Sequence, residues 1–141
     1  MRISTKGVYA IRMLIDLAQH KNDGYIALKD IAQRQNISKK YLEQIVSTLN
    51  KSHILQTNRG FQGGYRLAVS PECCSVGRVL KLTEGSLSPV PETMGSYSIY
   101  DDPCYFVWQG LKNVIDEYLE SITIQDIVDQ LTEIYANYYV I

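Results

Sequence analysis

The chain has 141 residues and a mass of 16.0 kDa, which fits one domain or a small domain with an oligomerisation element. Hydrophobic residues make up 45% and charged residues 21%, a balance that argues against intrinsic disorder. No apolar run approaches the roughly 18 residues of a membrane span, and the start of the chain is too polar for a signal peptide. Three cysteines, two of them adjacent, form no disulfide framework. We therefore expect a cytoplasmic protein without membrane association.

The net charge of −1 conceals two halves of opposite sign. Residues 1–70 carry eleven Lys or Arg against four Asp or Glu, a net charge of +7. Residues 71–141 carry three basic residues against eleven acids, a net charge of −8. This asymmetry favours a polyanion-binding region joined to a region that avoids polyanions. On charge alone, two solvated faces without a binding role remain the alternative.

Residues 5–19 predict a first amphipathic helix, followed by a turn at 21–24 and a short second helix at 29–34. The apolar positions of the first helix recur at steps of three and four: Val8, Ile11, Leu14, Ile15 and Ala18.

The third helix is predicted from Lys39 to about Ser52, with Ser38 as its N-cap. It buries one apolar face, made of Leu42, Ile45, Val46 and Leu49. Strands at 54–57 and 65–69 follow, and the three glycines between them predict a hairpin. The order of helix, short helix, turn, exposed polar helix and glycine-rich hairpin is typical of a winged helix-turn-helix.

The second half begins with a short helix at 76–83, capped by Ser75, and a long irregular loop at 85–102. A long helix at 103–121 and a last segment at 123–135 complete the chain, the latter opening with a capping box between Thr123 and Asp126. The long helix carries a broad apolar stripe of Val107, Leu111, Val114, Ile115, Tyr118, Leu119 and Ile122.

The expected fold is mainly α with a small β-hairpin, in two regions. Residues 1–70 form the winged helix-turn-helix domain, and residues 71–141 form a dimerisation and regulatory region with an effector loop at 85–103 and a long helix at 103–121.

A major groove about 12 Å wide admits the third helix, whose polar side chains are the candidate DNA contacts. Gln44 can pair with adenine and Glu43 can accept from cytosine, although Glu43 can instead pair with Lys39 or Lys40. The two lysines suit phosphates, and Arg59 suits the minor groove or a phosphate. The full candidate set is Arg2, Ser4, Lys6, Tyr9, Ser38, Lys39, Lys40, Tyr41, Glu43, Gln44, Thr48, Arg59 and Gly60.

Catalysis finds no support in the sequence. Neither His20 nor His53 has a nucleophile or carboxylate at motif spacing, and there is no P-loop, dinucleotide fingerprint or HExxH motif. We expect no enzyme activity, catalytic residue or metal site.

Short motifs recur from the start of the chain to the end of the long helix. They are Arg2-Ile-Ser-Thr-Lys-Gly7, Tyr9-Ala10, Ile37-Ser38, Tyr41-Leu-Glu-Gln44, Arg59-Gly60, Gly63-Gly64-Tyr65, Val76-Gly77, Glu84-Gly85 and Thr123-Ile124. Together they closely resemble the BadM/IscR/CymR family of bacterial winged-helix transcription regulators. The resemblance implies a homodimer built on the long helix, with each wing on one half-site of a pseudo-palindrome in double-stranded DNA. It also implies DNA contacts by Tyr41, Glu43, Gln44 and Arg59.

Sensors of that family bind an iron–sulfur cluster through three cysteines in the loop before the long helix. This chain has only Cys104 there, whereas Cys73 and Cys74 precede the short helix, so we expect no cofactor. Cys104 is either a redox-sensitive thiol or a buried structural cysteine.

Residues 82–90 resemble the cluster-free branch of the family, which represses cysteine and sulfur-assimilation genes and forms a complex with O-acetylserine thiol-lyase. Serine acetyltransferase docks on that enzyme through a terminal isoleucine. Ile141 is therefore a hypothetical anchor in the enzyme's active site, the alternative being an aromatic tail folded on its own dimer. Alternative functions are a regulator of the same family that senses iron, nitric oxide or redox state, and a protein-interaction module without a DNA target.

Overall fold

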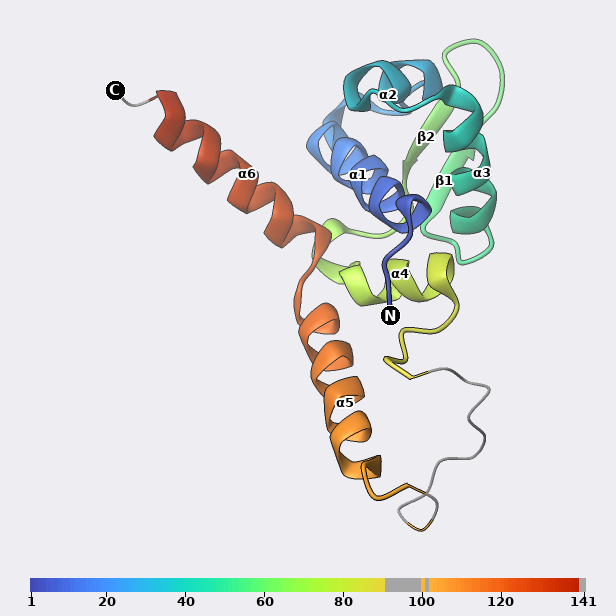
Figure 1. The fold of residues 1–141 in the computed structure, drawn as a ribbon. Coiled ribbons are helices and arrows are strands. Elements are labelled where there is room, and N and C mark those ends of the chain that lie inside the picture. Colours follow the sequence, from blue (N-terminus) through green and yellow to red (C-terminus); the bar gives the residue numbers. More distant parts are fainter. Residues whose placement is uncertain (91–99, 101, 140–141) are drawn as a thin grey trace.

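The computed structural model describes residues 1–90, 100 and 102–139, which form a helical body carrying one β-hairpin (Figure 1). The strands β1 (Leu55–Asn58) and β2 (Gly64–Leu67) pair antiparallel, with Leu55 opposite Leu67 and Asn58 opposite Gly64. In chain order the elements are α1 (Thr5–Gln19), η1 (Lys21–Asp23), α2 (Leu28–Gln35), α3 (Lys39–Asn50), β1 (Leu55–Asn58), β2 (Gly64–Leu67), η2 (Pro71–Cys73), α4 (Val76–Glu84), α5 (Tyr105–Ser121) and α6 (Ile124–Tyr139).

This architecture confirms the expected fold class, with small changes at the element boundaries. α1 has the predicted bounds, α5 begins two residues later than expected, and α6 extends four residues further. The late start of α5 follows a turn in which the Asp102 carboxylate accepts a hydrogen bond of 2.8 Å from the Cys104 amide. Of the predicted effector loop, residues 91–99 and 101 lie outside the described residues. No helix in the described part of the chain is long and apolar enough to cross a membrane.

α1 is the central helix, and its buried side is rotated from the predicted stripe. Val8 was expected in that stripe but is 40% exposed, and Ile11 and Ile15 are only half-buried. The prediction for Val8 is wrong because α1 contacts α2, α3 and β2 as well as α4 and α6, so its burial is set by several neighbours rather than by one apolar stripe. The side chains that α1 buries in the core are Ala10, Met13, Leu14, Leu17 and Ala18.

One hydrophobic core runs through the molecule. It joins α1 to Ile31 of α2 and to the buried face of α3, which is the predicted one. Cys74, Val79 and Ile124 belong to the same core, so it crosses residue 70. The division into regions at residue 70 stays a prediction about function, since packing is continuous across it.

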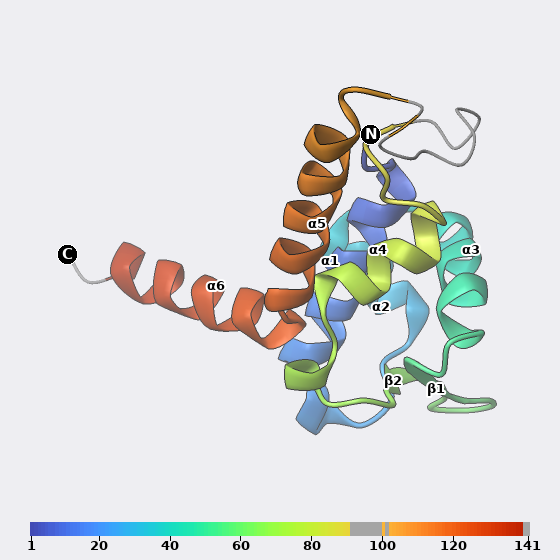
Figure 2. The ribbon, with the colours of Figure 1, turned by 90° about the horizontal axis from the view of Figure 1, so that it is seen from below.

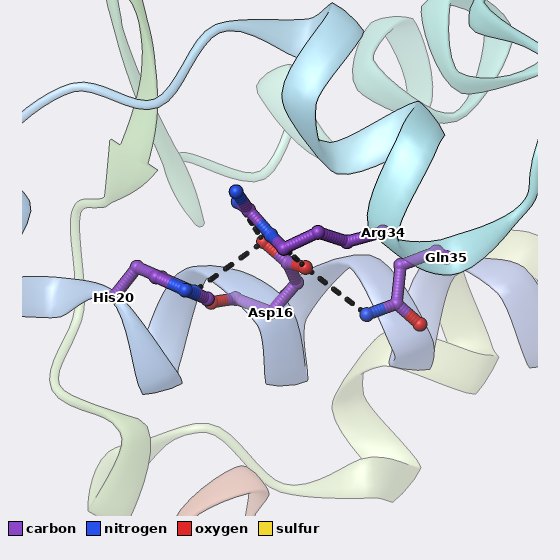
Figure 3. Close-up of polar contacts among 4 residues, drawn as sticks. All are labelled: Asp16, His20, Arg34 and Gln35. Carbon is purple, nitrogen blue, oxygen red and sulfur yellow. Dashed lines mark hydrogen bonds and ion pairs between the residues drawn. The ribbon is translucent and has the colours of Figure 1, made fainter.

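An ion pair between the buried Asp16 carboxylate and the exposed Arg34 joins α1 to α2 (Figure 3). Asp16 is 1% exposed, and Arg34 donates to its carboxylate through Nε at 2.9 Å and Nη2 at 2.7 Å. Gln35 adds a third hydrogen bond, from Nε2 to Oδ2 at 3.0 Å. The hydrogen bond to Asp16 raises the pKa of Arg34 above its ordinary value. A bidentate contact of this kind fixes the orientation of the guanidinium as well as its distance from the carboxylate. It therefore sets how α2 lies on α1.

A second polar contact fixes the end of α5 against α4. Glu120 accepts hydrogen bonds from Ser75 Oγ at 2.8 Å and Lys81 Nζ at 3.1 Å, which lower the pKa of its carboxyl group. The backbone continues the contact, since Val76 N donates to Ile122 O at 2.8 Å. A side chain at Gly77 would collide with Glu120. We call Ser75, Gly77, Lys81 and Glu120 the α4–α5 junction.

Replacement of Asp16 by Asn is expected to lower the free energy of unfolding by about 1–3 kcal/mol, because an amide in the buried position of the carboxylate cannot accept all the hydrogen bonds that Arg34 and Gln35 donate. Denaturant unfolding followed by circular dichroism measures the effect. The control is Asp23→Asn, an exposed carboxylate of η1, which should change stability by less than about 0.5 kcal/mol. Equal losses in the two variants would contradict the assigned role of Asp16.

Candidate nucleic-acid interface

The N-terminus of α3 is built by local sequence signals. Asn36 adopts the left-handed conformation, with φ of 53°, and turns the chain after α2. Ser38 then caps α3, its hydroxyl oxygen accepting a hydrogen bond of 3.1 Å from the Tyr41 amide. The predicted N-cap is confirmed, and the helix begins at Lys39 as expected.

The outward side of α3 carries exposed polar groups and is held in place by its buried apolar face. Thr48 is half-buried, and its hydroxyl donates to the Gln44 carbonyl oxygen at 3.3 Å. Within the described residues, no ion pair joins Glu43 to Lys39 or Lys40, so all three charged groups face solvent. The exposed side chains of this surface are Lys39, Lys40, Glu43, Gln44 and Ser47.

An aromatic contact brings α1 to the first turn of α3. The rings of Tyr9 and Tyr41 meet edge to face, with centroids 5.5 Å apart. Arg12 lies over the Tyr9 ring, with its guanidinium carbon 5.7 Å from the ring centroid. The structure thus brings together two predicted candidates and adds Arg12, which the sequence reasoning missed. The spacing of three residues between Tyr9 and Arg12 on one helix was the available signal.

The hairpin is anchored to the body at its base. Ile26 and Tyr65 exchange two backbone hydrogen bonds of 2.8 Å, and Gly64 lies so close to the Ile26 carbonyl that a side chain would collide with it. Arg59 and Gly60 lie in the exposed turn. An open hollow of about 580 Å³ between the end of α3 and the hairpin is lined by Asn50, Thr57, Asn58, Arg59, Gly60, Gly64 and Tyr65.

A second arginine of the hairpin, Arg66, was not among the candidates. Its guanidinium carbon lies 4.5 Å from the centroid of the Tyr25 ring, and Nε donates to Gln56 Oε1 at 2.8 Å. Gln56 is the cross-strand partner of Arg66. The arginine is exposed but held in one orientation, as a preformed contact for an anion requires.

The candidates at the N-terminus have different surroundings. The Ser4 hydroxyl accepts from the Gly7 amide at 3.1 Å and donates to Glu84 Oε1 at 2.7 Å, so it fastens α1 to α4. The N-terminus accordingly lies beside α4 (Figure 1). Arg2 is exposed and Lys6 half-buried.

The cysteines do not fit an iron–sulfur cluster. Cys104 immediately precedes α5, whereas the Cys74 carbonyl accepts a hydrogen bond of 2.9 Å from Ile124, just after the other end of that helix. A helix of 17 residues is about 25 Å long, so the thiols of Cys104 and Cys74 cannot ligate one cluster in a single chain. In the described residues, no group of three or more His, Cys, Asp or Glu can hold a metal ion.

The cysteines also differ in exposure. Cys73 and Cys104 are exposed, whereas Cys74 is buried in the core, where burial raises the pKa of its thiol. Of the two alternatives for Cys104, a cysteine buried within its own chain does not fit this position, because α5 leaves the body and its first turn is not covered. The structural cysteine of this chain is Cys74.

Comparison with known proteins agrees with this geometry. A family model named Rrf2, described as an iron-dependent transcriptional regulator, matches residues 3–130. The chain is 35% identical over 127 residues to the HTH-type transcriptional regulator CymR of Bacillus subtilis, covering 90% of this chain and 89% of CymR. The structure of that global cysteine regulator superposes with a TM-score of 0.80 at 33% identity, over 92% of this chain and 98% of the other. The structure of IscR of T. potens superposes with a TM-score of 0.74 at 38% identity, over 93% of this chain and 88% of the other.

Proposed function

The chain belongs to the Rrf2 family of transcriptional regulators and is not an enzyme, and we propose that it is a sequence-specific DNA-binding repressor that acts as a homodimer. The observation that carries the proposal is the polar outward side of α3 beside an anchored, arginine-bearing hairpin, in a half of the chain with a net charge of +7. Phosphates supply the complementary charge, and a helix of this kind fits the major groove.

The side chains on the outward side of α3 divide between phosphates and base edges in this proposal. Lys39 and Lys40 neutralise phosphates, which gives affinity and salt dependence but no choice of sequence. Gln44 and Glu43 reach base edges, where the amide pairs with adenine and the carboxylate accepts from cytosine. Tyr41 stands at the first turn, where Tyr9 and Arg12 support it.

The hairpin and the N-terminus extend the contact along the duplex. Arg59 enters the minor groove or meets a phosphate beside the hollow at the end of α3. Arg2 and Lys6 place positive charge near the phosphate backbone of the DNA. Ser4 acts indirectly, since its hydroxyl already serves α1 and Glu84.

The homodimer is supported by α5, none of whose residues is buried. Val107, Leu111, Val114 and Tyr118 follow one another at steps of four, three and four, the spacing of a helix-on-helix seam, and they are 42–63% exposed. α5 and α6 project from the body, and α6 points away on the side opposite α3 and the hairpin (Figures 1 and 2). A second copy paired along this seam buries these side chains and leaves both α3 helices free for two half-sites.

The regulated genes are proposed to be those of cysteine and sulfur metabolism. Support comes from residues 82–90, which resemble the cluster-free branch, from the likeness to CymR and from cysteines that do not fit a cluster. A second candidate signal within the same family is redox state, which the exposure of Cys104 favours.

A complex with O-acetylserine thiol-lyase, anchored by Ile141, is the proposed route of regulation. Ile141 lies outside the described residues, and α6 carries the chain to Tyr139, away from the body (Figure 1). The apolar side chain of Ile141 suits a site built to grip an amino acid.

The triple variant Lys39→Gln, Lys40→Gln and Arg59→Gln is expected to lose DNA affinity, because each lost phosphate contact removes counterion release. The slope of log affinity against log salt should fall by about 2 to 3. Gel shifts over a salt series, with a duplex that the wild-type protein selects from a random pool, measure both quantities. Lys112→Gln in α5 is the control and should bind as wild type. Unchanged binding by the triple variant would exclude the proposed interface.

Val114→Glu is expected to produce a monomer, because it places a carboxylate in the proposed apolar seam. Size-exclusion chromatography with light scattering measures the mass. Lys112→Gln, which lies off the seam on the same helix, should stay dimeric. A wild-type protein that is monomeric at every concentration would rule out the homodimer.

Removal of Ile141 is expected to weaken binding to purified O-acetylserine thiol-lyase by at least about tenfold, measured by calorimetry. DNA binding by the regulator alone should not change. Equal affinity of the truncated and the 141-residue chains for the enzyme would reject the anchor.

A further inference from the structure

The turn of the hairpin is a rigid support for one residue, Phe61. Gly60 and Gln62 on either side have positive φ values of 102° and 62°, and the Gly63 amide donates to the Gly60 carbonyl at 2.9 Å. A side chain at Gly63 would collide with the carbonyl oxygens of Asn58 and Gly60, so the turn closes tightly. Phe61 lies at its apex and is 96% exposed.

Folding does not account for this phenylalanine. At 96% exposure the ring packs against almost nothing within the chain. Among the described residues of positions 1–90, the other exposed large hydrophobic side chains are Met1 at 61% and Val8 at 40%. The ring is therefore open to a partner, in the half of the chain with net positive charge.

The surroundings of Phe61 favour DNA over a protein partner. A protein hot spot is an aromatic anchor inside a larger contact surface, whereas the neighbours of Phe61 are Arg59, two glycines and Gln62. A minor groove suits this mixture, because its narrow, negative form attracts arginine and its floor accepts apolar side chains inserted at base steps.

We propose that Phe61 enters the minor groove beside Arg59 and packs on deoxyribose and base edges. The inference rests on the proposed DNA-binding function and names a contact within it. Arg59 supplies the charged part of the hairpin's contact and Phe61 the apolar part. The hairpin then favours base-pair steps that unstack readily or that narrow the minor groove. This preference adds to the base sequence that α3 contacts in the major groove.

The test compares Phe61→Ala with Arg59→Gln on a duplex selected by the wild-type protein. Phe61→Ala should weaken binding by about tenfold without changing the salt slope, since an apolar contact releases no counterions. Arg59→Gln should reduce the slope by about one. Phe61→Leu should recover part of the affinity, and Gln62→Asn, a change beside it that tolerates positive φ, should bind as wild type.

Hydroxyl-radical cleavage of the same complexes locates the contact, because it reports the accessibility of sugars in the minor groove. Wild type should protect sugars beside each half-site, and Phe61→Ala should lose that protection while the major-groove contacts of α3 persist. Affinity of Phe61→Ala within twofold of wild type, or unaltered protection, overturns the proposal. Absence of salt-dependent binding by the wild type instead rejects the DNA-binding function itself, so the two failures are distinguishable.

Discussion

The contact between the buried Asp16 carboxylate and Arg34 is the constraint on which the DNA-facing surface depends. α3 follows α2 after only a short turn at Asn36, so whatever fixes α2 on α1 also fixes where α3 begins. Apolar packing alone tolerates sliding and rotation of one helix on another. A carboxylate that is 1% exposed and gripped by two nitrogens of one guanidinium does not, because any shift leaves a charge unpaired in the core.

The two sides of the molecule follow different physical rules. The side formed by α3 and the hairpin exposes charges and amides, whose partners in the proposed complex are phosphates and base edges. The α5 side exposes Val107, Leu111, Val114 and Tyr118, whose proposed partner is the same surface of a second copy. The division of charge along the sequence matches this division, since residues 1–70 carry a net charge of +7 and residues 71–141 a net charge of −8.

Sequence reasoning predicted the features that local signals encode. The bounds of α1, the caps at Ser38 and Ser75 and the buried face of α3 follow from periodicity and short-range hydrogen bonds, and the structure confirms them. Features set by distant partners were not predictable in the same way. Asp16 meets Arg34 across 18 positions and Ser4 meets Glu84 across 80, and no local pattern marks either pair. The exposure of Cys104 depends on α5 leaving the body, which periodicity cannot show.

The α4–α5 junction is the point about which the long helix α5 can tilt. α5 is about 25 Å long, so a tilt of about ten degrees at Glu120 displaces its far end by about 4 Å. α4 connects this junction to the body, because Arg78 of α4 donates a hydrogen bond to the Ser52 carbonyl oxygen just beyond the end of α3. In the proposed homodimer paired along α5, the angle between α4 and α5 sets the distance between the two α3 helices, and with it the half-site spacing that the pair of helices fits.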